Sequence, residues 1–251
     1  MTSPLRFPNQ HGAWAFLVIP SIITAFLGGG SWYGLLFSLT WVCAFPVSYF
    51  LTSAFVARMR KKRWTSRAKR ELQSAAPWGF LTVLGSALIV QSRAWILLEA
   101  LVLVFVWSAS VYLSLIGRER GVTNDLLLVA LASTAPIFMY QISKNEESLS
   151  AIPNKIWIVC IISFLFFTGS VLHVKALIRE AKSRKWHLIS IWFHLLVTIG
   201  LIFFVPAVAI AFFIGLLRTL FMRPGLRPSK IGAVEAAVGS ALILCTVISQ
   251  R

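Results

Sequence analysis

The stretch GSVLHVKALIRE, residues 169–180, brings four ionisable side chains to the end of an apolar run. His173, Lys175, Arg179 and Glu180 lie within eight residues there, although each of them is expensive to place in lipid. Lysine and arginine side chains neutralise phosphate and carboxylate groups and donate hydrogen bonds to them. The stretch therefore suits either a helix that is leaving a membrane or the edge of a polar chamber that contacts an anionic headgroup.

A second group of polar residues recurs at helical spacing. His187, Ser190, His194 and Thr198 fall within about 80° of one another when successive residues are turned by about 100°. Ser190 and His194 have the spacing of a nucleophile and its base, but no acid that would orient the histidine is identifiable. An interior hydrogen-bonding role for His194 is favoured over a merely tolerated histidine, whereas His187 also suits a purely interfacial position.

The spacing of these groups does not indicate a metal site. His187 and His194 are seven residues apart, which is too far for the i, i+4 pair that clasps one ion. Asp125 follows Asn124, and both residues suit a helix N-cap as well as a ligand. No phosphate loop or dinucleotide fingerprint is present, so the sequence predicts no metal and no cofactor. On the side of the membrane predicted to be cytoplasmic, no two carboxylates have the spacing of metal ligands on one helix. These carboxylates are Glu71, Glu119, Asp125, Glu180 and Glu235.

Composition places these residues in a membrane protein. Hydrophobic residues make up 58% of 251 positions and charged residues 13%, about half the share typical of a soluble domain. Several apolar runs reach or approach the ~20 residues that a spanning helix needs, and the backbone in lipid must satisfy its own amides. The sequence therefore predicts an all-α polytopic bundle, one membrane domain over residues 1–251. The nine expected spans are 13–30, 32–56, 76–92, 94–116, 126–142, 156–178, 188–204, 206–222 and 231–249.

The count of nine depends on residues 188–222, which could form one long helix or two short ones. If the Arg-rich segment 58–74 is cytoplasmic, nine spans leave 20 of the 24 Lys and Arg residues on the inside. A merged helix would move RPGLRPSK to the outer face and weaken that asymmetry. The positive-inside rule favours a break near Pro206, with the N-terminus inside and the C-terminus outside. Short loops beside an anionic leaflet then explain the net charge of +16 without nucleic acid.

Polar stripes in the second, sixth and seventh spans favour a chamber that is open to the cytoplasm. A polar side chain that faced lipid would stay unsatisfied, so these stripes should face the bundle interior. The alternatives are Ser and Thr side chains that bond to a carbonyl one turn earlier, and Lys or Arg side chains that snorkel to headgroups. The candidate chamber residues are His11, His173, Lys175, Arg179, Glu180, His187, Ser190 and His194.

Four motifs carry a resemblance to a known family. They are NQHGAW before the first span, GSVLHVKALIRE at the end of the sixth, HLISIWFHL opening the seventh and RPSKIGAVE opening the last. Together, and over essentially the whole chain, they resemble the YwiC-like family of bacterial integral membrane proteins. The resemblance implies a multi-pass protein of the bacterial cytoplasmic (inner) membrane.

The layout is also similar, more distantly, to the UbiA-type intramembrane prenyltransferases. The nine helices, the basic loops after spans two and six, and the segment SVYLSLIGRERGVTNDLLLVALAS carry this likeness. Those enzymes bind Mg²⁺-diphosphate through two Asp-rich motifs, whereas SAFVARMRKKR has no acid and GSVLHVKALIRE has only Glu180. Two Mg²⁺ ions need several oxygen ligands, so Mg-dependent prenyl transfer is not expected. Lys175 and Arg179 could still neutralise a diphosphate directly.

Three classes of function stay open. The favoured one is an enzyme or binder of a lipid-like or anionic substrate, such as an isoprenoid, with membrane lipids as partners. A transporter or permease would need polar groups in the outer halves, where Glu99 is almost the only charge, and no inverted repeat is visible. A scaffold could dock a partner through RMRKKRWTSRAKR, although binding to the lipid surface explains those residues as well.

Overall fold

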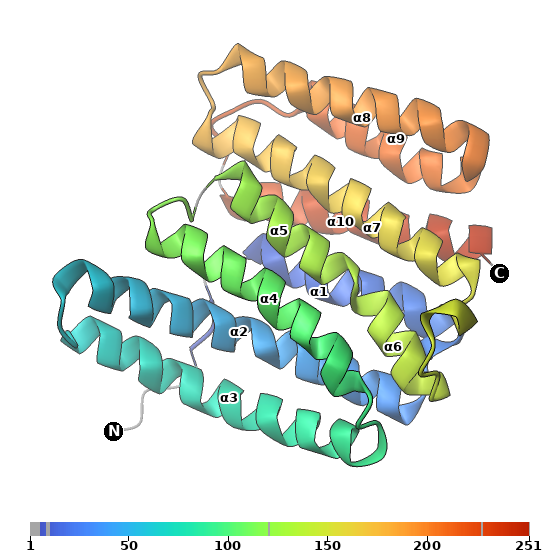
Figure 1. The fold of residues 1–251 in the computed structure, drawn as a ribbon. Coiled ribbons are helices and arrows are strands. Elements are labelled where there is room, and N and C mark those ends of the chain that lie inside the picture. Colours follow the sequence, from blue (N-terminus) through green and yellow to red (C-terminus); the bar gives the residue numbers. More distant parts are fainter. Residues whose placement is uncertain (1–5, 9–10, 120, 227, 251) are drawn as a thin grey trace.

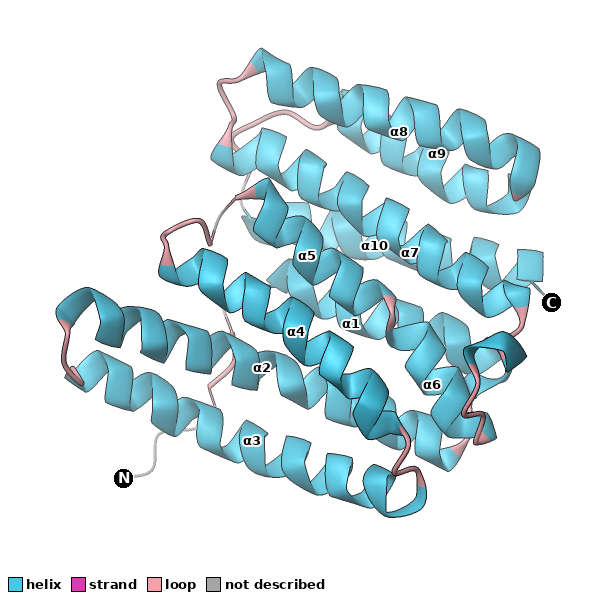
Figure 2. Ribbon diagram, viewed as in Figure 1, coloured by secondary structure: helices cyan, strands magenta, loops and turns pink. Residues whose placement is uncertain are grey.

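The computed structural model describes residues 6–8, 11–119, 121–226 and 228–250, and all regular structure in these ranges is helical (Figure 1, Figure 2). The predicted all-α class is thus confirmed. Two π-helical segments, η1 (Ala25–Gly29) and η3 (Lys175–Arg179), extend α1 and α7, and η2 (Leu149–Ala151) is a single 3₁₀ turn. The α-helices are α1 (His11–Thr24), α2 (Trp32–Lys61), α3 (Ser66–Ser92), α4 (Ile96–Leu115), α5 (Val122–Ser133), α6 (Ala135–Lys144), α7 (Asn154–Val174), α8 (Arg184–Phe204), α9 (Pro206–Phe221) and α10 (Pro228–Gln250).

Each of the nine predicted spans coincides with helix in the described residues. Two of these segments, Ala13–Gly29 and Pro206–Phe221, are apolar but shorter than a usual span. The remaining seven are long and apolar enough to cross a membrane, which supports a multi-span membrane protein. These seven are Trp32–Lys61, Ser66–Ser92, Ile96–Leu115, Val122–Lys144, Asn154–Arg179, Arg184–Phe204 and Lys230–Gln250.

The predicted break near Pro206 is confirmed. α8 ends at Phe204, Val205 leaves the helical conformation with φ −146° and ψ 71°, and α9 begins at Pro206. Proline suits the first helical position because its φ is already helical and its missing N–H would have no partner there. The chain reverses at this point, so α8 and α9 pack against each other as a hairpin (Figure 1).

The helix ends differ from the prediction at the connection between α2 and α3. The sequence predicts a basic loop over 58–74, whereas α2 continues to Lys61 and α3 already begins at Ser66. Thr65 starts α3 as its N-cap, since its Oγ1 accepts a hydrogen bond from the Ala68 N–H at 3.1 Å. Hydropathy detects only the apolar part of a helix, and the charged turns that extend it were therefore missed.

The predicted span 126–142 is interrupted in the structure. α5 ends at Ser133 and α6 begins at Ala135, so two helices share one apolar segment. Pro136 in the first turn of α6 has no N–H to donate to the preceding turn, which ends the regular hydrogen-bond ladder. At the junction, the Thr134 hydroxyl donates to the Leu131 carbonyl at 2.7 Å, a carbonyl that also accepts from the Thr134 backbone N–H at 3.3 Å.

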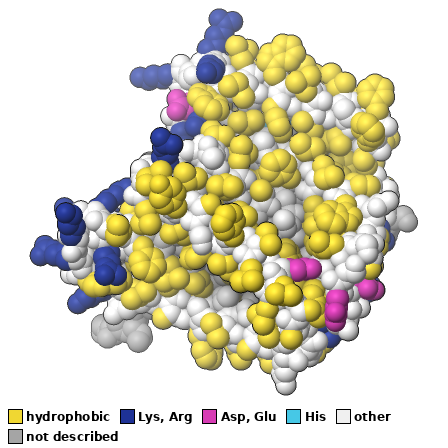
Figure 3. Space-filling model, viewed as in Figure 1, with side chains coloured by type: hydrophobic (Ala, Val, Ile, Leu, Met, Phe, Trp, Pro, Cys, Tyr) yellow, Lys and Arg dark blue, Asp and Glu magenta, His cyan; other side chains and the backbone are white. Residues whose placement is uncertain are grey.

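The helices run between two ends of the bundle. The α2–α3, α4–α5, α7–α8 and α9–α10 connections lie on the left in Figure 1, at what we call the basic end, and the α3–α4, α6–α7 and α8–α9 connections lie at the opposite end. Figure 3 shows most Lys and Arg side chains of this face gathered along the left margin, with broad apolar surface between the two ends. This charge asymmetry is of the kind that the positive-inside rule describes.

Apolar side chains cover much of the outside of the bundle, while α7 lies in its centre. Leu98 and Phe105 on α4 are 75% and 77% exposed, and Phe204 at the end of α8 is 85% exposed. A surface of this kind suits lipid rather than water. α7 instead packs against α1, α5, α6, α8 and α10. It supplies the main core with Ile156, Val159, Ile162, Phe166 and Phe167.

Candidate functional site

A buried chain of polar side chains begins at His194 on α8. This histidine is 3% exposed, with its Nδ1 2.7 Å from the Ser190 carbonyl oxygen and its Nε2 3.1 Å from Nη2 of Arg218. Because a guanidinium group can only donate, Nε2 of His194 accepts, and Nδ1 carries the proton that is donated to Ser190. His194 is therefore the neutral, Nδ1-protonated tautomer, and its predicted interior hydrogen-bonding role is confirmed.

Arg218 on α9 continues the chain to α10 and α7. Its Nη1 lies 2.5 Å from Oε1 of Glu235, and the Ser170 hydroxyl donates to Oε2 of the same carboxylate at 2.7 Å. Arg218 is only 7% exposed, and a charge buried to this extent needs a partner of opposite sign. Ser170, Glu235, Arg218 and His194 thus connect α7, α10, α9 and α8, and we call them the four-helix network.

Two glycines leave room for the His194 ring. A Cβ atom on Gly169 of α7 would lie 2.8 Å from Nε2 of His194, and a Cβ atom on Gly215 of α9 would lie 3.4 Å from its Cδ2. The first distance is too short for a carbon–nitrogen contact, whereas the second is close to ordinary contact. Gly169 therefore allows α7 to approach the imidazole with its backbone, which a larger residue would prevent.

The spacing of Ser190 and His194 does not produce a nucleophile and its base. Both ring nitrogens of His194 are engaged elsewhere, and the buried Ser190 hydroxyl has no hydrogen-bond partner in the described part of the chain. His173, 1% exposed, likewise has no partner there for its Nε2, and the charge of Arg218 acts on it. Both side chains are buried polar groups beside the four-helix network.

A second polar group lies at the basic end. Nη1 of Arg179 is 2.7 Å from Oδ2 of Asp125, which joins the end of η3 to the start of α5. Lys175, at the start of η3, is 9% exposed, and its Nζ lies 4.3 Å from the centre of the Trp186 ring. Its charge also acts on Asp125. One carboxylate therefore stands beside two cations, and the group carries a net positive charge.

The N-cap alternative for Asn124 and Asp125 is wrong. The N-cap of α5 is Gly121, which offers no side-chain hydrogen bond. Oδ1 of Asn124 instead accepts from the Ser110 hydroxyl at 2.6 Å, and this contact ties α5 to α4. Asp125, the next residue, does not cap the helix either, and its carboxylate pairs with Arg179.

Asp125 also lines an apolar cavity of about 350 Å³, which we call the Asp125 cavity. Its walls come from α1, α2, α3, α4, α5 and α7, and Asp125 is its one charged residue among those that the structure describes. Nε1 of Trp107 donates to the Ser48 hydroxyl at 2.5 Å, so these two polar groups of the wall satisfy each other. Nε1 of Trp41 is buried in the wall and has no acceptor in the described residues.

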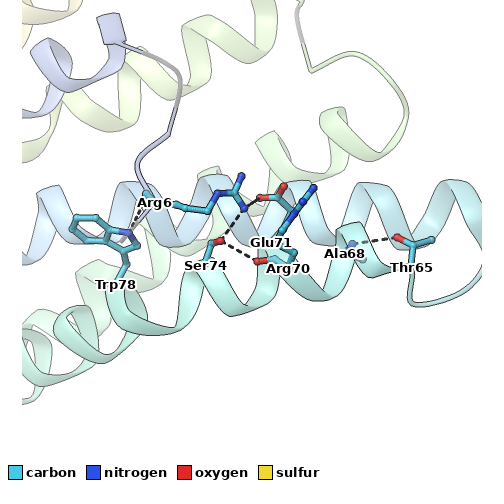
Figure 4. Close-up of polar contacts among 7 residues, drawn as sticks. All are labelled: Arg6, Thr65, Ala68, Arg70, Glu71, Ser74 and Trp78. Atoms are coloured by element: carbon cyan, nitrogen blue, oxygen red, sulfur yellow. Dashed lines mark hydrogen bonds and ion pairs between the residues drawn. The ribbon is translucent and has the colours of Figure 1, made fainter. Parts of the chain in front are cut away.

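The N-terminal segment 6–8 is fixed to α3. Figure 4 shows the Arg6 side chain directed at two side chains of α3, with Nη1 donating to the Ser74 hydroxyl at 2.9 Å and lying 3.5 Å from Oε2 of Glu71. The backbone carbonyl of Arg6 accepts a hydrogen bond from Nε1 of Trp78 at 3.0 Å. Backbone and side chain of Arg6 are thus both held by the same helix.

Aromatic contacts lead from this segment to the Asp125 cavity. The Phe7 ring centre lies 6.2 Å from that of Trp14 on α1, and the Trp14 ring lies 5.1 Å from Phe45 on α2. Phe45 in turn lines the cavity. The N-terminal segment therefore packs, through two rings, against one wall of the cavity.

The eight predicted chamber residues do not form one site. Ser190 and His194 lie with the four-helix network and His173 beside it, whereas Lys175 and Arg179 accompany Asp125 at the basic end. Of the remaining three residues, Glu180 and His187 are half-buried in the connection between α7 and α8 and the first turns of α8. His11 begins α1, and its side chain lies outside the described part of the structure. In the described ranges, no three His, Cys, Asp or Glu side chains gather as metal ligands.

Sequence reasoning missed Arg218 and Glu235 as partners. The positive-inside count treated Arg218 only as a charge at the inner end of the predicted span 206–222, and Glu235 was considered only as a metal ligand. The available signal was an ionisable residue inside each of the apolar segments 206–222 and 231–249, because such residues in a membrane rarely stay unpaired.

The fold and these buried polar groups define the chain as a multi-span helical membrane protein. A family model described as YwiC-like protein matches residues 7–140, and the chain belongs to this family, as predicted. An uncharacterized protein of Haemophilus influenzae is 27% identical over 251 residues, which covers 98% of both chains. The uncharacterized protein YwiC of Bacillus subtilis is 25% identical over 191 residues, 75% of this chain and 74% of its own. No solved structure matches.

Proposed function

We propose that this protein binds a lipid-like molecule, with an apolar chain and an anionic head, in the Asp125 cavity. The observation that carries the proposal is an apolar space of about 350 Å³ whose described lining residues include one charged side chain, Asp125, which is paired to a cation at the basic end. Sites for small molecules are typically concave and mostly apolar, with a few placed polar groups that fix the orientation of the ligand.

The charges around Asp125 favour an anionic head. Asp125 contributes one negative charge and Arg179 and Lys175 contribute two positive ones, so the group has one cation in excess. The planar guanidinium of arginine suits phosphate and carboxylate oxygens, and the buried ammonium of Lys175 gains by approaching an anion. Elsewhere in the wall, the buried indole N–H of Trp41, which has no acceptor among the residues that the structure describes, suits an acceptor oxygen of the same ligand, such as a carbonyl or ether.

The proposal includes the orientation of the protein in the membrane. The nine helical segments form one membrane domain in the layout of the UbiA-type enzymes, with the basic end and the N-terminus in the cytoplasm and the C-terminus outside. The cavity is then a chamber loaded from the cytoplasmic leaflet. η3 takes the place of their second acidic motif, and its cations Lys175 and Arg179 hold the anion directly rather than through Mg²⁺.

The experiment is mass spectrometry of the lipids and small molecules that co-purify with the protein. Wild type is compared with Ala44→Phe, which fills the cavity, and with Arg179→Ala, which removes a cation beside Asp125. The matched controls are Ala87→Phe, on an exposed face of α3, and Arg184→Ala, an exposed cation at the start of α8. All variants must reach the same membrane abundance and thermal midpoint as wild type.

We expect one amphipathic species to be enriched in wild type and in both controls, and to fall about tenfold or more in Ala44→Phe and Arg179→Ala. The same bulk phospholipids in all five preparations, in the same proportions, would refute the proposal. Loss of the species in Arg184→Ala as well would assign it to the basic surface instead of the cavity.

A further inference from the structure

We propose a second lipid site, separate from the Asp125 cavity: the groove between α9 and α10 binds one acyl chain of an anionic phospholipid and holds its phosphate at the basic end. This site does not depend on the proposed function, because it lies on other helices and opens on the outer surface of the bundle.

The groove has a volume of about 590 Å³ and is largely open to the outside. Ala233, Ala237 and Ala241 recur every fourth residue on α10 and thus lie along one face of the helix. Their small side chains leave a trough whose opposite wall is built by Leu217 and Phe221 of α9. An apolar trough of this shape fits a flexible hydrocarbon chain.

The length of the groove corresponds to one leaflet. Lys230 and Ala241 are eleven residues apart on α10, which is about 16 Å at 1.5 Å per residue. Half of a hydrocarbon core of about 30 Å is about 15 Å. Because the groove starts beside the α9–α10 connection, a chain lying in it belongs to the leaflet at the basic end.

Charge identifies the kind of lipid. Lys230 lies at the basic end of the groove and is exposed, and Arg218 lines the groove from α9. Arg218 is 7% exposed and is already paired with Glu235, but its Nε has no hydrogen-bond acceptor in the described residues. Arg223 stands in the adjoining connection. This end of the groove therefore attracts a phosphate, as basic pockets between membrane helices do for anionic headgroups.

The same charges disfavour a second copy of the chain as the occupant. The protein carries a net charge of +16, and none of the described residues lining the groove is acidic. Two copies packed groove to groove would bring the exposed Lys230 of each close to cations of the other, and like charges repel. An anionic lipid instead neutralises Lys230.

The test is native mass spectrometry of the detergent-solubilised protein with phosphatidylglycerol or phosphatidylcholine of identical acyl chains. Two variants probe the site: Ala237→Phe fills the groove, and Lys230→Gln removes the cation at its end. Ala236→Phe, an exposed neighbour on α10 that does not line the groove, and Lys185→Gln, an exposed lysine at the basic end, are the matched controls.

We expect wild type to retain one phosphatidylglycerol about tenfold more tightly than phosphatidylcholine. Ala237→Phe and Lys230→Gln should lose this preference, and both controls should keep it. Equal retention of the two lipids by wild type would overturn the proposal, as would an equal loss in Lys185→Gln, which would indicate surface charge alone. A dimer that disappears in Ala237→Phe would overturn it in favour of a second copy. Ala44→Phe, which blocks only the Asp125 cavity, should leave phosphatidylglycerol binding unchanged.

Discussion

Glu235→Met tests whether the four-helix network holds α7, α8, α9 and α10 together. Methionine keeps a side chain of similar length but removes the carboxylate that lies 2.5 Å from Arg218. The guanidinium, 7% exposed, would then stay buried without a described partner of opposite charge, which costs about 3–5 kcal/mol. The Ser170 hydroxyl would also lose its acceptor, which adds about 1 kcal/mol. We expect the free energy of unfolding to fall by about 4–6 kcal/mol.

A double-mutant cycle isolates the ion pair. Arg218→Met alone should cost a similar amount, because it leaves the Glu235 carboxylate without its cation and Nε2 of His194 without its donor. The double variant should be far less destabilised than the sum of the two, since replacing a buried ion pair by apolar side chains is often close to neutral. The assay is equilibrium unfolding in mixed micelles, followed by circular dichroism. Additivity within about 0.5 kcal/mol would refute the direct interaction.

Two further predictions concern close packing and the N-terminal segment. Gly169→Ala should lower the free energy of unfolding by about 1–3 kcal/mol, because the new Cβ would lie 2.8 Å from His194. Gly215→Ala, whose Cβ would lie 3.4 Å from the same ring, should cost less than half as much. Thermal midpoints in detergent compare the two variants, and equal shifts would contradict the packing argument. Trp78→Phe removes the hydrogen bond to the Arg6 carbonyl and should increase proteolysis of the N-terminal segment without shifting the global midpoint, whereas unchanged proteolysis would show that this contact does not hold the segment.

Hydropathy predicted the helices because in lipid an apolar run of sufficient length has few alternatives to helix. It could not predict where charged helical turns continue into water, and it therefore missed the first ten residues of α3, which begins at Ser66. It also could not predict the interruption at Thr134, because the residues on both sides of it, VALAS and APIFM, are mostly apolar. The break near Pro206 was predictable, since the loop charges constrained the number of spans.

The candidate site was predicted only in part, because periodicity gives the face of a helix but not its neighbour. The stripe of α8 was assigned to the interior, and His194 is indeed buried and hydrogen-bonded. Its partner Arg218 follows 24 residues later on another helix, and Asp125 lies 54 residues before Arg179. Such pairs depend on how the helices are arranged, and no local pattern encodes that arrangement.

The length of α9 affects the bilayer around the protein. Its 16 residues measure about 24 Å, whereas the 21 residues of α8 measure about 31 Å, close to the hydrocarbon thickness of about 30 Å. Because the two helices join at the opposite end, an α9 that crosses the bilayer alone would fall short by about 6 Å at the basic end, beside Arg223. Lipids there would then compress, or the membrane would dimple toward the connection. A thin membrane should therefore accommodate this protein at a lower elastic cost than a thick one.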